Sequence, residues 1–136
     1  MARFLCLIYL DESELAAMSE PDMSALNAEH LRYNSGLHAN GHFVEAEALT
    51  PASHTACVRV RNGKRTVTDG PFVETKEMVA GFYLIEARDI TEAAALAAEI
   101  PAARLGTVEV RPTRHLIVDG QSHPPLSYAT AARSAS

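Results

Sequence analysis

The sequence predicts an α+β domain in which one antiparallel sheet carries two helices on the same face. The first indication is the order of patterns along the chain, which is strand, helix, strand or hairpin, strand, helix, strand. The second is that residues 4–10 and 79–86 are apolar at nearly every position, as central strands covered on both faces are. The third is the length of 136 residues, which suits a single hydrophobic core.

The first helix is expected to follow the strand of residues 4–10 and to lie between Ser19 and Gly41. Ser19 is a favoured N-cap, and the acidic residues and the proline that follow it suit the first turn of a helix. Gly41 should end the helix, because glycine readily adopts the left-handed conformation. Side chains on the core-facing side recur every three or four residues: Met23, Leu26, His30, Tyr33 and Leu37.

A hairpin is predicted in the middle of the chain, after a short strand that begins with Phe43 and Val44. Residues 54–61 alternate between apolar and polar side chains, as a strand with one covered face does. Asn62-Gly63 then suits the positive φ angles of a type I′ turn. Residues 64–68 should therefore return antiparallel to the preceding strand.

The second helix is expected to begin at the capping box of Asp89 and Glu92 and to end near Pro101. Its apolar side is built largely of alanine, so the helix can lie close against a sheet. A last strand over residues 107–111 alternates in polarity and is interrupted by Pro112.

This order of elements matches the split βαβ arrangement of ferredoxin-like folds. The sheet face opposite the helices would be bare although two of its strands are apolar on both sides, and such a face is an association surface. We therefore expect a homodimer that packs through its sheets. The ferredoxin-like domain is assigned to residues 1–118. Residues 119–136, rich in Ser, Ala and Pro, are expected to form an extended tail.

Composition argues against several classes of function. A net charge of −5 with 12 basic residues disfavours nucleic-acid and anionic-membrane partners, and the basic residues near the hairpin turn are better explained as a solvated turn. The apolar run of residues 4–10 is too short to span a membrane, and no export signal follows it. Cys6 and Cys57 are expected to be reduced thiols, which indicates the cytoplasm. A helix end separates His38 from His42, and no metal or cofactor motif is found.

His30 and Asp69 are the residues best suited to carry out chemistry. An imidazole on an otherwise apolar helical stripe is partly desolvated and could act as a general acid or base. A structural histidine with its ring nitrogens bonded to the backbone explains the same position equally well. Asp69 opens a rigid turn with Gly70 and Pro71 between two strand patterns, where sites are often built, but an aspartate there also caps turns.

Three further side chains could bind a ligand. Arg59 and Arg111 lie on the polar sides of strands and could hold an anionic group through two hydrogen bonds, or could simply be exposed edge charges. Tyr83 lies within an apolar strand, where its hydroxyl could donate to a ligand or its ring could belong to the core.

The chain resembles the YCII-related proteins and, among them, the DGPF group, named for the tract that is Asp69-Gly70-Pro71-Phe72 here. The resemblance is carried by an ordered series of segments, namely residues 7–9, 58–64, 68–72, 74–77, 81–85, 100–102 and 108–112. The chain departs from the family pattern at residues 78–80 and in its length beyond Pro112. The resemblance implies a dimeric α+β barrel, in which two sheets pack face to face. It also implies a cleft histidine on the first helix paired with an aspartate, here His30 with Asp69.

Two kinds of function are compatible with this resemblance. In the first, an enzyme without a cofactor uses His30, oriented by Asp69, to move a proton on a small anionic or aromatic molecule, and Arg59, Arg111 and Tyr83 help to bind it. In the second, the same cleft binds a metabolite without reaction, or the dimer engages a regulator. The frequent association of DGPF proteins with alternative sigma factors suits this second function.

Overall fold

A computed structural model describes residues 1–124 of the chain. In chain order its elements are β1 (Ala2–Leu10), α1 (Glu12–Ala17), α2 (Glu20–Ala39), β2 (Phe43–Ala48), the 3-10 turn η1 (Ala52–His54), β3 (Ala56–Arg61), β4 (Lys64–Asp69), β5 (Met78–Ala87), α3 (Ile90–Ala98), the 3-10 turn η2 (Pro101–Arg104), β6 (Thr107–Pro112), β7 (Leu116–Val118) and β8 (Gln121–His123). The two long helices and the predicted strands all form close to their expected bounds.

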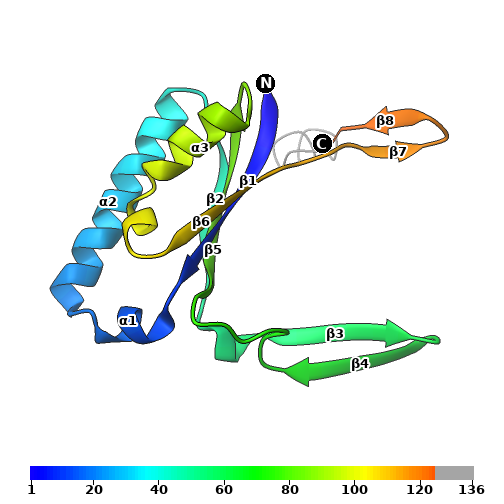
Figure 1. Ribbon diagram of the computed structural model, residues 1–136, viewed down its shortest axis with the longest axis horizontal. Helices are drawn as coiled ribbons and strands as arrows, with labels where there is room; N and C mark the ends of the chain where they lie inside the picture. Colours follow the sequence, from blue (N-terminus) through cyan, green and yellow to red (C-terminus); the bar gives the residue numbers. More distant parts are fainter. Residues whose placement is uncertain (125–136) are drawn as a thin grey trace, which may run out of the picture.

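Four of the strands form one antiparallel sheet in the order β2, β5, β1, β6. Helix α2 leads from β1 to β2 and helix α3 leads from β5 towards β6, and Figure 1 shows both helices on the same face of the sheet. Strands β1 and β2 run in the same direction with β5 between them, which is the split βαβ arrangement. The predicted ferredoxin-like α+β fold, with its helices on one face, is confirmed.

The hydrophobic core lies between this sheet and the two helices. Alternate residues of β1 face the helices and are buried, namely Phe4, Cys6, Ile8 and Leu10. They belong to one cluster with Tyr83, Ile85 and Ala87 of β5, Ala93 and Ala97 of α3 and Leu37 of α2. Full burial of one aliphatic side chain such as Ile85 stabilises the fold by about 1.5–3 kcal/mol. The small side chains of α3 allow this helix to lie close to the strands, as its composition predicts.

The opposite side of the sheet, here called the open face, is not covered by any element of residues 1–124 (Figure 1). Its centre is apolar, because the strand register places Leu5 opposite Leu84 and Leu7 opposite Phe82. These four side chains are half-buried. At the rim of the open face lie Glu45 and Glu47 on β2 and Glu109 and Arg111 on β6. Within a single chain, β1 and β5 are therefore covered on one face only, although their sequences predict that both faces are covered.

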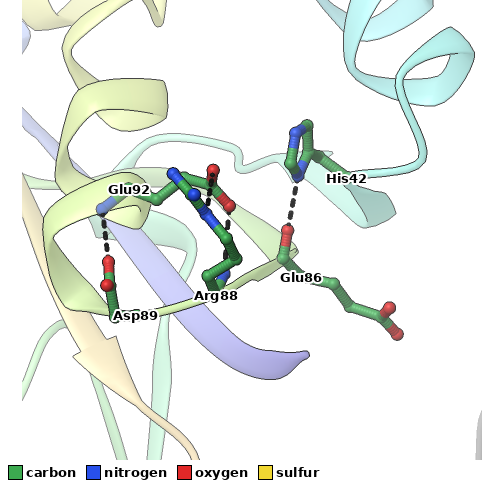
Figure 2. A network of polar contacts seen from close by, with 5 residues as sticks. All are labelled: His42, Glu86, Arg88, Asp89 and Glu92. Carbon is green, nitrogen blue, oxygen red and sulfur yellow. Dashed lines mark hydrogen bonds and ion pairs between the residues drawn. The ribbon is translucent and has the colours of Figure 1, made fainter.

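Both ends of α2 are held as the sequence predicts. The Ser19 hydroxyl accepts a hydrogen bond from the N–H of Asp22 at 3.2 Å, and Gly41, just past the end, has a φ of 78°. The chain then enters β2 through His42, whose Nδ1 donates to the carbonyl oxygen of Glu86 at 2.7 Å (Figure 2). The N–H of Glu86 donates back to the carbonyl oxygen of His42 at 2.8 Å. This imidazole thus ties the start of β2 to β5.

The N-terminus of α3 carries the predicted capping residues, shown in Figure 2. A carboxylate oxygen of Asp89 accepts from the N–H of Glu92 at 2.9 Å. The Glu92 carboxylate reaches back and accepts from the N–H of Arg88 at 3.0 Å and from its Nε at 2.8 Å. The carboxylate therefore bonds one residue before the N-cap, a small variation on the expected reciprocal pair.

Two hairpins stand apart from the four-stranded sheet. Strands β3 and β4 pair only with each other, and their turn has φ values of 52° at Asn62 and 75° at Gly63, which confirms the predicted turn residues. Strands β7 and β8 form a second hairpin that was not predicted from the sequence, turning at Asp119 and Gly120 with φ values of 51° and 75°. The tail was expected to begin at Asp119, so this hairpin crosses the expected boundary. Residues 125–136 of the expected tail lie outside the described residues.

Candidate functional site

A cavity of about 570 Å³ lies between α2 and the strands β2 and β5. Figure 1 shows α2 leaning away from the sheet towards its N-terminal end, and the residues of α2 that line the cavity run from Met23 to Asn34. Most of the lining is apolar, including Leu10, Leu15, Leu26 and Ala80. The polar side chains that reach the cavity from α2 and from the helix-covered face of β5 are Asn27, His30, Asn34 and Tyr83. This size and composition are usual for a site that binds a small organic molecule.

His30 presents one free ring nitrogen within this lining. Its Nδ1 lies 3.1 Å from the carbonyl oxygen of Leu26, one turn back along α2. A carbonyl only accepts, so Nδ1 carries the hydrogen of the neutral ring and Nε2 keeps its lone pair. No hydrogen bond to Nε2 is present among residues 1–124. The hydrogen bond to the backbone thus gives Nδ1 of His30 a structural role, and Nε2 is able to accept a proton.

Tyr83 and Asn34 form a hydrogen-bonded pair in the cavity wall. The Tyr83 hydroxyl donates to the side-chain oxygen of Asn34 at 2.5 Å. Burial raises the pKa of Tyr83 to about 12, so the phenol stays protonated and acts as a donor at neutral pH. The Tyr83 oxygen can still accept a hydrogen bond, and the Asn34 amide can still donate one. This pair can therefore orient a polar group of a ligand.

Tyr33 supports Tyr83 from the side of the core. The two rings meet edge to face, with centroids 5.6 Å apart and an interplanar angle of 81°. The Tyr33 hydroxyl donates to the carbonyl oxygen of Leu96 at 2.5 Å, which ties α2 to α3. Such an aromatic pair adds about 0.5–1.5 kcal/mol beyond the area that it buries. The position of the Tyr83 ring in the cavity wall is thus fixed by packing as well as by Asn34.

The structure places Asp69 away from His30 within a single chain. Asp69 ends β4 at the base of the β3–β4 hairpin, where the N–H of the next residue, Gly70, donates to the carbonyl oxygen of Thr55 at 2.7 Å. The Asp69 side chain is exposed, is absent from the cavity lining, and makes no hydrogen bond or ion pair with the residues that the structure describes. One chain alone therefore does not form the expected His–Asp pair.

The two candidate arginines also lie outside the cavity. Arg59 is on β3, and its guanidinium carbon lies 5.1 Å from the centre of the Phe72 ring. Arg111 is on β6, opposite Leu5, at the rim of the open face. Of the five predicted site residues, the structure brings together His30 and Tyr83. Arg59, Asp69 and Arg111 are distributed over the hairpin and the open face.

Two polar lining residues, Asn27 and Asn34, were not identified from the sequence. They lie three and four residues from His30 on α2, so all three share one side of the helix. This row of polar residues on one side of the helix was the feature of the sequence that could have identified the two asparagines as site residues. It was missed because the adjoining apolar stripe accounts for the same turns of the helix.

Within residues 1–124, none of the helices combines the length and the apolar character that crossing a membrane requires. No group of three or more His, Cys, Asp or Glu side chains in that range is arranged to hold a metal ion.

The fold and this cavity define a ferredoxin-like α+β protein with an open sheet face. The pattern of the YCII-related domain matches residues 2–117, so the chain belongs to the YCII-related family, as its sequence features predict. It is also similar to the uncharacterized protein R00369 of Rhizobium meliloti (strain 1021), with 35% identity over 115 residues. That alignment covers 80% of this chain and 90% of the relative. The name of the relative gives no activity.

Proposed function

We propose that this chain is a DGPF-group member that binds a small organic molecule in the α2 cavity and transfers a proton through His30. The observation that carries this proposal is the unpartnered Nε2 of His30 in a largely apolar cavity. The neutral Nε2 accepts a proton from the ligand, and the hydrogen bond from Nδ1 to the Leu26 carbonyl stabilises the imidazolium that forms. The reverse transfer returns the proton.

The cavity lining favours an aromatic ligand over an anionic one. Its apolar walls can enclose a ring, and Asn34 with Tyr83 can bond a carbonyl or hydroxyl substituent. An anion would require a basic partner, and the candidate arginines Arg59 and Arg111 are not in the lining. The fitting class is therefore a small aromatic or other ring compound with one polar substituent.

Asp69 remains a predicted partner of His30, and this pairing requires a second chain. In the proposed homodimer the open faces of two copies meet, and the hairpin that carries Asp69 extends on that side (Figure 1). Such a carboxylate would strengthen the basicity of a histidine. The carbonyl of Leu26 already orients His30 within its own chain, so the proposed proton transfer does not depend on the pairing.

Metabolite profiling tests this proposal without a prior guess at the substrate. The purified protein and its His30→Gln variant are incubated with a cell extract, and small molecules are compared by mass spectrometry. We expect one compound to be consumed, and a product to form, with the wild type alone. His38→Gln is the matched control, because His38 is exposed on the same helix and does not line the cavity.

The other candidate function, binding without reaction, gives a different outcome. A ligand would then be recovered unchanged from both proteins, with a lower affinity for the His30→Gln variant. A wild type that neither binds nor alters any compound would contradict both functions of the cavity.

A further inference from the structure

The β3–β4 hairpin exposes an apolar face that nothing covers within residues 1–124. Val58, Val60 and Val67 are 61%, 58% and 54% exposed. Strand pairing places Val58 opposite Val67, and Val60 opposite Arg65, on one face of the hairpin. An isolated two-stranded hairpin is only marginally stable in water. A hairpin of six residue pairs with three exposed valines is thus expected to be stabilised by a contact outside its own chain.

The position of the hairpin indicates where that contact lies. Figure 1 shows the β3–β4 hairpin extending from one end of the sheet, on the side away from α2 and α3. The β7–β8 hairpin extends to the same side from the other end of the sheet. Its side chains Leu116, Ile117 and Val118 are 63%, 69% and 57% exposed. The open face therefore lies between two projecting apolar hairpins.

Charge complementarity favours a second copy of this chain as the occupant. Residues 56–69 hold four basic residues and one acidic residue, a net charge of +3. The whole chain carries −5, so the remainder carries −8. The hairpin is therefore attracted to the body of another copy. The exposed carboxylates Glu45, Glu47 and Glu109 lie at the rim of the open face.

We propose that the β3–β4 hairpin is an arm that crosses to a second copy of this chain and packs its valine face on that copy. Arg65, which lies beside Val60 on this face, would meet a carboxylate at the rim of the partner's open face. This inference depends on the homodimer of the proposed function and adds a second contact between its two chains. Each arm would cover apolar surface that a sheet-to-sheet contact alone leaves exposed.

Isotope-mixed cross-linking tests whether the arm crosses between chains. Equal amounts of unlabelled and ¹⁵N-labelled protein are mixed and joined with a carbodiimide, which links lysines to carboxylates. The lysines of the chain are Lys64, at the tip of the arm, and Lys76. We expect peptides that join Lys64 of a light chain to an acidic residue of a heavy chain.

A pair of variants on neighbouring residues of β4 tests the valine face. Val67→Glu places a charge on that face, and Thr66→Glu places the same charge on the opposite face. Both positions are exposed in one chain, so neither variant disturbs the core. We expect the dimer dissociation constant to rise about tenfold or more for Val67→Glu, equivalent to about 1.4 kcal/mol, and to change little for Thr66→Glu.

The outcomes separate failure of the arm from failure of the dimer. A wild type that is dimeric, with Lys64 links only inside single chains and equal dissociation constants for the two variants, would overturn the arm and leave the sheet-to-sheet dimer standing. A wild type that is monomeric would overturn both.

Discussion

At the scale of single residues, one hydrogen bond determines what His30 can do. The Leu26 carbonyl takes the Nδ1 hydrogen and leaves the Nε2 lone pair free in the cavity lining. His30 and Tyr83 could be predicted as candidates because each interrupts an apolar pattern with a polar group. Asn27 and Asn34 could not be selected in the same way, since amide side chains are common on helices and the role of each depends on the residues that the fold brings next to it.

Cys6 provides a prediction about alkaline pH. It is fully buried in the core, and burial raises the pKa of Cys6 from 9.0 to about 11. As the pH rises past 9.0, the unfolded chain loses this proton before the folded protein does. The free energy of unfolding should therefore fall between pH 9.0 and about 11.

Urea unfolding across this pH range measures the effect of Cys6. We expect a smaller loss of stability in Cys6→Ala, which has no thiol, than in the wild type. Cys57→Ala is the control, because Cys57 lies on the hairpin outside the core cluster. Equal pH dependence in the wild type and in Cys6→Ala would show that another group is responsible.

At the scale of elements, local chemistry predicts the ends of helices and the turns of hairpins better than it predicts short helices and short strands. The caps at Ser19 and Asp89 and the turn at Asn62-Gly63 follow from side chains that act on their own backbone. The same reasoning applies to Asp119-Gly120, whose turn was missed because its strands span only three residues each. Helix α1 has six residues, which is too short for an apolar period to be recognised.

Replacing glycine by alanine is expected to change the free energy of unfolding in opposite directions at two positions. A Cβ on Gly36, within α2, would meet no atom within 4 Å, so Gly36→Ala should raise the free energy of unfolding by about 0.5–1 kcal/mol. A Cβ on Gly106 would overlap the carbonyl oxygen of Tyr9, so Gly106→Ala should lower it by about 1–3 kcal/mol. Urea denaturation of both variants checks the signs. A stable Gly106→Ala would mean that β1 and the start of β6 are less closely packed.

At the scale of the whole molecule, the sequence predicts the sheet and its helices but not how three candidate residues relate to the site. The order of elements is enough for the topology, because a split βαβ unit has few alternatives. Arg59, Asp69 and Arg111 lie on the hairpin and on the open face, and the order of elements in one chain does not determine what approaches those surfaces. Their roles depend on the second copy that we propose.

Disruption of the open face tests the proposed dimer. Leu5→Glu introduces a charge at the centre of this face, where Arg111 on the neighbouring strand can pair with it inside one chain. In sedimentation velocity experiments we expect a dimeric wild type and a folded, monomeric Leu5→Glu. Ala94→Glu, an exposed position on α3, should remain dimeric. If Leu5→Glu and Ala94→Glu had the same state of association, the interface would not lie on the open face.

The measurement that tests the proposed role of His30 most directly is the protonation of its ring, read from ¹⁵N NMR of histidine-labelled protein at alkaline pH. The hydrogen bond to Leu26 predicts a neutral ring with hydrogen on Nδ1 and a bare Nε2, which takes a proton when an aromatic ligand with an acidic hydrogen is added. A neutral ring with its hydrogen on Nε2, unchanged by every such ligand, would contradict the proposal.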